Sequence, residues 1–359
     1  MAHVLLALAI LVVGNALVMW GLARLRPGRW RTRGIGALVA LDAALVMLLA
    51  LEVGMTFFFA QSDGFNITMS SRNWFARHWH PINSLGYRDA EPRPKVPGEK
   101  LVLVVGDSFA AGHGIDRVRD RFGDVLGRDL GQGWRVANAS QIGWDTVDED
   151  KALESYPETP DVVVLAYFVN DIYRAAEKTK FPLPFHVQFP KSAVTKYLVD
   201  HFALANFAYW RLARVGNVED ASRVFWQRLR AAYADPRVWA AHAAELDAIV
   251  NWCRDRHVRL IALVIPSLAD VAASAPMTAR VTTYFRERGV QTVDMTPLLA
   301  GRNPGDMVVN GVDSHANVAL NAEMAGLLQN AILSPPTSPD GRPPAAVSTP
   351  SAPGAKEGS

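Results

Sequence analysis

The sequence predicts an α/β protein: a three-layer α/β/α sandwich around a parallel sheet of about five strands, preceded by a two-helix transmembrane hairpin. Between residues 99 and 333, short apolar runs rich in β-branched residues alternate with amphipathic segments, as is typical of parallel strands and their crossover helices. The first sixty residues contain two apolar stretches of membrane-spanning length. Half of the 359 residues are hydrophobic and 20% are charged, which excludes wholesale disorder and a coiled-coil rod.

The two apolar stretches cover residues 4–23 and 35–60, and arginines fill the loop between them: Arg24, Arg26, Arg29, Arg31 and Arg33. By the positive-inside rule this loop is cytoplasmic, so the N-terminus and everything after residue 60 lie outside. A cleavable signal peptide carries positive charge before its apolar run, and no Lys or Arg precedes residue 4. Residues 1–60 are therefore predicted to anchor an exported domain in the cytoplasmic membrane.

The second stretch contains two carboxylates, Asp42 and Glu52. A carboxylate inside a membrane is costly and is a functional candidate by default. The alternative is that each lies near an interface, pairs with another helix or is protonated. The two residues do not share a helix face, which favours this alternative.

The remaining elements follow in chain order. Residues 61–98 are expected to be a connector. Strands are expected at Leu101–Val105, Arg135–Ala137, Val162–Phe168, Val258–Ile265 and Val290–Asp294, and helices at Arg117–Leu130, Pro236–Arg256 and Asn317–Leu333. A helical insertion near 192–235 interrupts the alternation. Residues 334–359, rich in Pro, Ser, Ala and Gly, are expected to be a disordered tail.

Charge and cysteine content exclude two further classes. The formal net charge is +2, so the chain without the five loop arginines carries −3 and offers no electrostatic surface for nucleic acid. Cys253 is the only cysteine, which excludes a disulfide framework and a thiolate zinc cluster.

The residues with the clearest chemical potential follow the predicted strands. The first strand is followed by Gly106-Asp107-Ser108-Phe109, which places Ser108 in a tight turn before a helix, where its hydroxyl and backbone N–H are available. The second strand is followed by a loop with Gly143, and the third by Asn170. Asp313 and His315 lie in the segment 313–317, which directly precedes the last predicted helix. In a parallel sheet these loops converge at one edge, with a hydroxyl, a backbone donor, an amide, an imidazole and a carboxylate.

This order of blocks resembles the SGNH hydrolase superfamily, the GDSL-type esterases and lipases. It is most similar to a membrane-anchored bacterial branch that carries an Asn-Ser-Leu-Gly-Tyr-Arg-like stretch, here at 83–88. The resemblance covers roughly residues 83–333 and implies a hydrolase domain at 99–333. It implies that Ser108 is the nucleophile and His315 the base. It also implies an oxyanion hole formed by the amides of Ser108 and Gly143 and the side chain of Asn170.

The sequence departs from this family at three places. Phe168 stands where the third block usually begins with glycine, and Ala316 replaces a frequent proline after the histidine. The acid of the family usually lies three residues before the histidine, where this chain has Val312. Asp313, two residues before, is the expected orienter of His315, and a backbone carbonyl or another acid such as Asp306 is the alternative.

Other candidates are weaker. His78 and His80 have a spacing that could offer two metal ligands, but no third ligand accompanies them, and packing or surface roles are favoured. His113 could border the pocket. Trp144 is expected to pack rather than to stack on a substrate, and Asp171 to order its own loop.

Taken together, the residues and the resemblance predict a serine ester hydrolase that acts on acyl esters outside the cytoplasmic membrane. Its substrate would be an acylated small molecule, glycan or lipid, and no metal or organic cofactor is implied. Two alternatives remain open: an O-acyltransferase that uses the same Ser/His site, and a non-catalytic envelope-binding protein that retains the fold.

Overall fold

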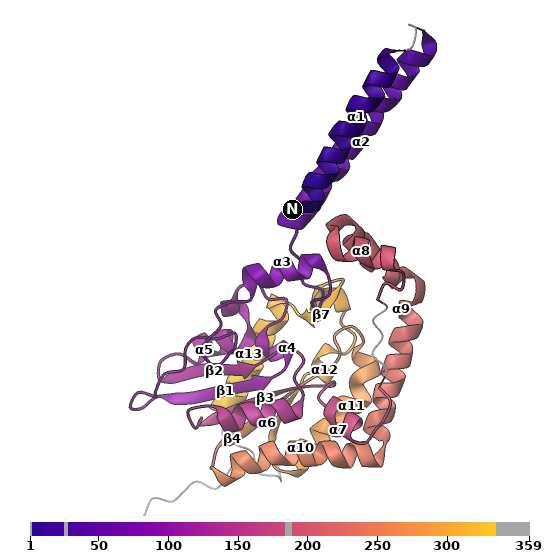
Figure 1. Ribbon diagram of the computed structural model, residues 1–359. Helices are drawn as coiled ribbons and strands as arrows, with labels where there is room; N and C mark the ends of the chain where they lie inside the picture. Colours follow the sequence, from indigo (N-terminus) through magenta and orange to yellow (C-terminus); the bar gives the residue numbers. More distant parts are fainter. Residues whose placement is uncertain (1, 25–27, 184–188, 335–359) are drawn as a thin grey trace, which may run out of the picture.

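The computed structural model describes residues 2–24, 28–183 and 189–334; within them, the side chains of 2–5, 7, 8, 11 and 213–223 are not described. The expected tail at 334–359 therefore lies almost wholly outside the described residues. The centre is a five-stranded sheet in the order β2-β1-β3-β4-β5, and every neighbouring pair is parallel. The strands are β1 Lys100–Gly106, β2 Trp134–Ser140, β3 Val162–Phe168, β4 Arg259–Ile265 and β5 Gln291–Asp294 (Figure 1). The predicted fold class is confirmed.

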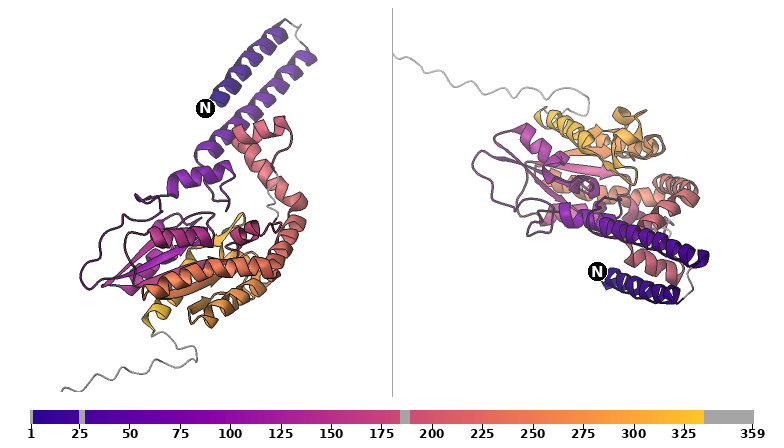
Figure 2. Two further views of the ribbon diagram at one scale, coloured as in Figure 1. Left: turned by 60° about the horizontal axis from the view of Figure 1, so that its bottom comes forward. Right: turned by 90° about the horizontal axis from the view of Figure 1, so that it is seen from above.

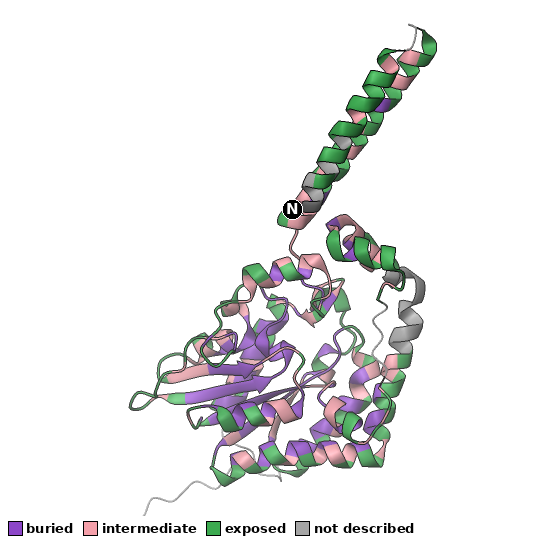
Figure 3. Ribbon diagram, in the orientation of Figure 1, coloured by how far each residue is buried: buried purple, intermediate pink, exposed green. Residues whose placement is uncertain are grey.

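Helices cover both faces of this sheet and create two hydrophobic cores. Along β1, Leu101 and Leu103 point into one core, whereas Val102 and Val104 point into the other, because side chains alternate along a strand. The first core is closed by α6 Thr146–Ser155, α10 Pro236–Asp255 and α11 Val271–Glu287, and the second by α5 Phe122–Leu130 and α13 Val318–Leu333. The inner strands β1, β3 and β4 are buried almost along their full length, whereas the first half of β2 and all of β5, at the two sides of the sheet, are half-buried (Figure 3).

The strand register brings the carboxyl ends of the first three strands to one edge. Gly106, the last residue of β1, is paired with Ser140 of β2 and Ala166 of β3. A Cβ on Gly106 would lie 2.8 Å from the Cβ of Ala110 and 3.0 Å from that of Ala166. Only glycine lets the turn after β1 fold back this closely onto the sheet.

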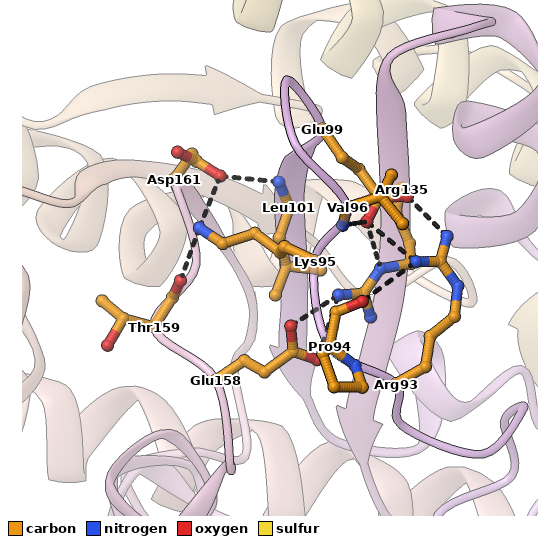
Figure 4. A network of polar contacts seen from close by, with 10 residues as sticks. All are labelled: Arg93, Pro94, Lys95, Val96, Glu99, Leu101, Arg135, Glu158, Thr159 and Asp161. Carbon is orange, nitrogen blue, oxygen red and sulfur yellow. Dashed lines mark hydrogen bonds and ion pairs between the residues drawn. The ribbon is translucent and has the colours of Figure 1, made fainter.

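The opposite edge of the sheet is held by ion pairs (Figure 4). Arg135 of β2 binds both Glu99 and Glu158, and Glu99 also pairs with Arg93. Asp161, just before β3, accepts hydrogen bonds from the backbone N–H of Leu101 at 2.7 Å and from Lys95 at 3.2 Å. The charged groups at this amino-terminal edge of the strands therefore pair with one another. The carboxyl-terminal edge carries the candidate catalytic residues.

The N-terminal hairpin consists of α1 Ala2–Ala23 and α2 Arg29–Phe57 and projects from the body (Figures 1 and 2). In the described part of the chain, α2 is the one helix long and apolar enough to cross a membrane, and Val12–Ala23 of α1 is a shorter apolar helix. Asp42 accepts a hydrogen bond from the Asn15 amide of α1 at 2.6 Å. Glu52 pairs outside the hairpin: its carboxylate accepts from the backbone N–H groups of Ala203 and Leu204 at 2.6 and 2.9 Å.

The expected insertion at 192–235 forms two helices, α8 Ala193–His201 and α9 Ala203–Ala234. Figure 1 shows α9 running from the base of the hairpin to α10, so that the insertion links the anchor to one side of the sandwich. The remaining elements are short: α3 Met69–His78, α4 Ser108–Ala111, α7 Tyr173–Lys178, α12 Thr296–Leu299, the antiparallel pair β6 Val308–Asn310 and β7 Asp313–Ala316, and 3-10 turns at Val118–Asp120 and Pro304–Asp306.

Candidate active site

Ser108 is the first residue of α4, directly after β1. The carboxylate of Asp107 accepts a hydrogen bond from the Phe109 N–H at 2.8 Å and so caps the four-residue helix. Gly112 ends it in the left-handed conformation, with φ 75°. This turn holds Ser108 at the carboxyl edge of the sheet, where only 9% of the residue is exposed.

Ser108, His315 and Asp313 form a continuous chain of hydrogen bonds. The Ser108 hydroxyl lies 2.8 Å from Nε2 of His315, and Nδ1 of His315 lies 2.6 Å from Oδ1 of fully buried Asp313. The same Oδ1 accepts from the backbone N–H of His315 at 3.0 Å. This local turn explains how an acid only two residues before the histidine reaches its ring. Asp306, the alternative acid, is exposed on a 3-10 turn.

The environment keeps Asp313 ionised. Burial alone would raise its pKa, but the charge and hydrogen bond of His315 outweigh burial, so the pKa lies well below its usual range. Oδ2 accepts a further hydrogen bond from the hydroxyl of Ser62. Asp107 differs: burial raises its pKa to about 6, although the Phe109 N–H opposes the rise. Its carboxylate is 3.4 Å from the Ser108 hydroxyl, farther than the imidazole.

The two other oxyanion candidates lie in the loops after β2 and β3. Gly143 is exposed in a turn with φ 76°, and no heavy atom lies within 4 Å of where its Cβ would be. Glycine is therefore favoured there by conformation rather than by space. Asn170 lies near Asp107, and the amide of Asn170 lowers the pKa of the Asp107 carboxyl. The buried Oδ1 of Asn170 has no hydrogen-bond partner in the described region. The role of both residues remains a prediction.

The segment expected to be a connector supplies several residues to the site. Besides Ser62, it contributes Arg88, which is fully buried and donates to the carbonyls of Gly112 and Ile115 at 2.6 and 2.7 Å. These bonds fix the loop that follows the nucleophile. Arg88 belongs to the 83–88 block that the sequence singled out, whereas nothing in the sequence indicated Ser62.

His113 stacks directly on the candidate base. Its ring lies 4.5 Å from that of His315 at an interplanar angle of 25°, and Trp74 stacks on it at 5.8 Å. Burial, together with the charge of His315, lowers the pKa of His113 to about 3, so this imidazole is neutral at physiological pH. His113 thus borders the site as an uncharged wall.

The possible metal ligands do not make a convincing metal centre. His113, Asp313 and His315 each offer an atom within 4.8 Å of the others. Both ring nitrogens of His315 are already engaged, however, with Ser108 and Asp313, so this group suits proton transfer better. His80 contacts the carbonyl of Arg77 through Nε2, and His78 lies 3.9 Å from Asp116.

A cluster of buried carboxylates lies behind the nucleophile. Glu149 of α6 is fully buried, and neither of its oxygens has a hydrogen-bond partner among the described residues. Burial and then the neighbouring charge of Asp107 raise the pKa of Glu149 well above its usual range. Asp171 behaves in the same way, and it accepts a hydrogen bond from the Phe168 N–H at 3.0 Å. This bond orders the third loop, as expected.

The flanking aromatic residues pack against one another. Trp144 meets Tyr87 edge to face at 5.8 Å, in line with the packing role expected for it. Phe168 is the residue that departs from the family pattern, and its ring centroid lies 4.5 Å from that of Phe109. The Phe109 ring centroid lies 4.8 Å from that of His315. The bulky residue therefore forms part of the wall beside the candidate base.

A cavity of about 660 Å³ lies beside the loop after β2, away from the triad. Its lining includes Asp145, which follows Trp144, together with Arg174 of α7 and Phe225 of α9. Arg174 is paired with Asp145 at 2.9 Å. The nucleophile is not among its lining residues, so the catalytic geometry rather than this cavity defines the site.

Comparison with known proteins gives likenesses of fold. No family model and no curated protein matches the chain. A candidate lipolytic protein of the G-D-S-L family from Desulfitobacterium hafniense is 14% identical, with 65% of this chain and 99% of that chain covered and a TM-score of 0.38. A psychrotrophic esterase from Pseudoalteromonas sp. and a carbohydrate acetylesterase family member from Sinorhizobium meliloti are each 15% identical, with coverage of 65% and 97% and a TM-score of 0.38.

The first of these structures is described as a member of the G-D-S-L family, which the sequence motifs resemble. Their identities are far below 25% and their TM-scores below 0.5. The function is therefore best argued from the contacts of Ser108, His315 and Asp313.

Proposed function

We propose that this protein is a membrane-anchored serine ester hydrolase that acts on acyl esters outside the cytoplasmic membrane. The observation that carries the proposal is the hydrogen-bond chain from Ser108 through His315 to Asp313, with distances of 2.8 and 2.6 Å. A nucleophile, a base and a buried orienting acid in this order define the Ser-His-Asp arrangement of acyl-transfer enzymes on unrelated folds.

The reaction follows from this geometry. Nε2 of His315 removes the hydroxyl proton of Ser108 while Oγ attacks the ester carbonyl carbon, and the carbonyl electron pair moves onto the oxygen. The tetrahedral intermediate collapses to an acyl-enzyme, and the leaving alkoxide takes the proton from His315. A water molecule, deprotonated by the same imidazole, then releases the acid and restores Ser108. Asp313 stabilises the imidazolium in both halves of the reaction.

The oxyanion would be held by the amides of Ser108 and Gly143 and by the side chain of Asn170. All three come from loops that leave the carboxyl edge of the sheet after β1, β2 and β3. Each preorganised donor strengthens as negative charge develops on the carbonyl oxygen, which is why such donors lower the barrier rather than merely bind substrate.

The anchor suggests where the substrate is found. The arginine loop between α1 and α2 would face the cytoplasm, so the catalytic domain would lie on the other side. Ser62, which contacts the triad acid, follows the last residue of α2, Phe57, by five positions. At about 3.4 Å per residue, Ser62 lies within roughly 17 Å of the end of α2, and the triad acid is in contact with it. An envelope glycan or lipid carrying an ester is the substrate class that fits this position.

The test uses the purified full chain in detergent micelles, with short- and long-chain acyl esters and acetylated glycans. Wild type should release acid and should be labelled by a fluorophosphonate at Ser108. Ser108→Ala should lose both properties, and His315→Ala should lose nearly as much turnover, because the two residues act as a unit. Ser84→Ala, which removes an exposed hydroxyl bound to Glu91 at 2.7 Å, is the matched control.

Wild-type ester turnover by Ser108→Ala would refute the proposal. Wild-type turnover by His315→Ala would remove only the assignment of the base. Acyl release that accelerates on addition of a glycan hydroxyl, with transfer of the acyl group to it, would identify an O-acyltransferase using the same residues. A properly folded chain with neither labelling nor turnover would point to a binding protein.

Topology is tested separately by reporters fused after the last residue. A phosphatase that is active only outside the cytoplasm should be active, and a fluorescent reporter that matures only in the cytoplasm should be dark. The reverse pattern would refute an exported domain without bearing on the chemistry.

A further inference from the structure

The short helix α8 has an apolar face that is largely exposed. Val194, Tyr197 and Leu198 are 71%, 49% and 42% exposed. They share one side of the helix, since residues three and four apart lie one above the other. The Tyr197 ring stacks on His201, the next residue on this side, at 4.3 Å. The charged pair Lys196 and Asp200 lies away from this stripe.

The opposite side of α8 is fixed to the protein. Val199 is buried, and its carbonyl accepts a hydrogen bond from the Asn206 amide of α9 at 3.0 Å. Oδ1 of Asn206 in turn accepts from the backbone N–H of Met69, the first residue of α3, at 3.1 Å. The apolar face is therefore held outward by a set of buried bonds and is not a loosely placed segment.

The anchor helix determines the level at which this face lies. Glu52 of α2 binds the first two backbone N–H groups of α9, directly after α8, and the Phe59 ring meets Phe207 at 5.8 Å. Both Figure 1 and Figure 2 show α8 beside the base of the hairpin. Glu52 precedes the end of α2 at Phe57 by five residues, which is about 7.5 Å along a helix axis.

This distance of about 7.5 Å along the α2 axis matches the depth at which an amphipathic helix lies in the interface of a membrane. Interfacial amphipathic helices bury their apolar side by roughly 5–10 Å at the boundary between headgroups and acyl chains. Phe57 and Phe58, at the end of α2, are also exposed, as expected of aromatic residues at an interface. The exposed face of α8 and these aromatic residues therefore lie near the same end of α2 (Figures 1 and 2).

We propose that α8 is an interfacial helix whose Val194–Tyr197–Leu198 face lies in the outer leaflet of the bilayer that α2 crosses. The proposal rests on the anchor of the proposed function and not on the ester chemistry. Together with α2, α8 provides a second attachment to the same leaflet. Two attachments restrict rotation about α2 and hold the catalytic edge of the sheet at a constant orientation to the lipid surface.

The experiment labels single cysteines in the full chain, reconstituted in nanodiscs of phosphatidylethanolamine and phosphatidylglycerol. The native Cys253 is 1% exposed and burial raises its pKa to about 12, so it reacts slowly with thiol reagents. Val194→Cys and Leu198→Cys carry an environment-sensitive fluorophore on the apolar face. Lys196→Cys is the matched control on the polar side of the same helix, and Leu48→Cys reports on α2.

A nitroxide on carbon 5 of the lipid acyl chains should quench the labels at 194 and 198 at least about twofold more than the label at 196. Aqueous iodide should quench the labels at 194 and 198 less than the label at 196. Equal quenching by iodide at all three positions of α8 would overturn the proposal. Shielding of 194 and 198 from both quenchers would also overturn it, because a protein, such as a second copy of this chain, would then cover the face.

The Leu48→Cys label separates this failure from failure of the anchor. Lipid quenching at 48 without quenching at 194 and 198 refutes only the interfacial helix. Absence of lipid quenching at 48 refutes the anchor and the interfacial helix together. None of these readouts requires ester turnover, so they stand whatever the catalytic test gives.

A double variant, Val194→Asp with Leu198→Asp, supplies a functional readout. Turnover of a long-chain ester embedded in the nanodisc should fall by about tenfold, since charged groups are expelled from the lipid boundary. Turnover of a water-soluble short-chain ester should not change. Equal turnover of the embedded ester by the variant and wild type would show that α8 does not orient the site.

Discussion

Removing the Ser62 hydroxyl tests whether the segment after the membrane helix takes part in catalysis. Ser62 is 2% exposed, and its hydroxyl donates to Oδ2 of Asp313, whereas Oδ1 serves His315. In Ser62→Ala, Oδ2 loses this donor in a place that water reaches poorly. The carboxylate is then held by His315 alone, and both its orientation and its charge distribution change.

The size of the effect follows from the kind of bond that is lost. A hydrogen bond to a charged group contributes about 1.5–3 kcal/mol. Because the bond exists in the ground state as well as in the transition state, we expect about half of this energy to appear in catalysis, which is roughly a four- to thirteenfold loss of kcat. The less neutralised carboxylate favours the protonated imidazole more strongly. The acid limb of the kcat/KM profile should therefore move to higher pH.

The effect on stability has a defined sign. The pKa of Asp313 in the folded protein is lowered, so its ion stabilises the fold above the unfolded value of about 3.9 and this contribution is lost as pH falls. Ser62→Ala raises the folded pKa towards the unfolded one. The variant should therefore melt at a lower temperature at pH 7, and the difference from wild type should shrink only as the pH falls through the folded pKa, well below about 3.9.

The assay is ester turnover between pH 5 and 9 by the purified full chain, with Ser84→Ala as the control that removes an exposed serine-carboxylate bond. Ser84→Ala should match wild type in rate, profile and melting. If Ser62→Ala retained the wild-type kcat and acid limb, Ser62 would not position the triad acid. A lower melting temperature with an unchanged pH profile would mean that its role is structural.

Three further outcomes are expected in the same assays. Asp313→Asn should lower kcat by about 10⁴, as when a triad acid is neutralised, and a slight loss would assign the orienting role to another group. Asn170→Ala should lower kcat by about 10²–10³ with little change in KM, and a rise in KM alone would exclude an oxyanion role. Glu149, whose pKa is raised, holds its proton in the fold to a higher pH than in the unfolded chain and so costs stability as pH rises. Glu149→Gln should therefore raise the melting temperature at pH 8 and not at pH 4. The free energy gained is up to about 1.4 kcal/mol for each pH unit above the unfolded pKa, and equal shifts in melting temperature at both pH values would refute a buried acid with a raised pKa.

The inner strands of the sheet were predictable because they are buried on both faces. Runs such as 162–168 and 258–265 are almost continuously apolar, and the observed strands Val162–Phe168 and Arg259–Ile265 match them within one residue. The second strand was predicted too short, at 135–137, because its carboxyl half contains the polar residues Asn138 and Ser140. Both polar residues are buried beside the turn that carries the nucleophile, so polarity there reflects the site rather than a loop.

Long-range contacts account for what the sequence did not predict. Ser62 and Asp313 are 251 residues apart, and a single serine after an apolar helix has no pattern that indicates a partner. Glu149 lies on a short helix among polar residues, and no sequence pattern distinguishes it from a surface acid. Its burial depends on how α6 packs against the sheet. The local turn from Asp313 to His315 lets the carboxylate reach the ring despite the unusual spacing, a contact that the sequence alone left open.

These contacts also bear on where the catalytic unit begins. A boundary near residue 98 would exclude Ser62, Trp74 and Arg88, which contact the triad acid, the stacked His113 and the loop after the nucleophile. Since these groups are buried together with the site, the segment after α2 folds as part of it. We therefore propose that the catalytic unit begins between Phe57 and Ser62. The proposed membrane helix and the triad would then be joined by a few residues, so that the same short segment would fix the position of the site at the membrane and complete its chemistry.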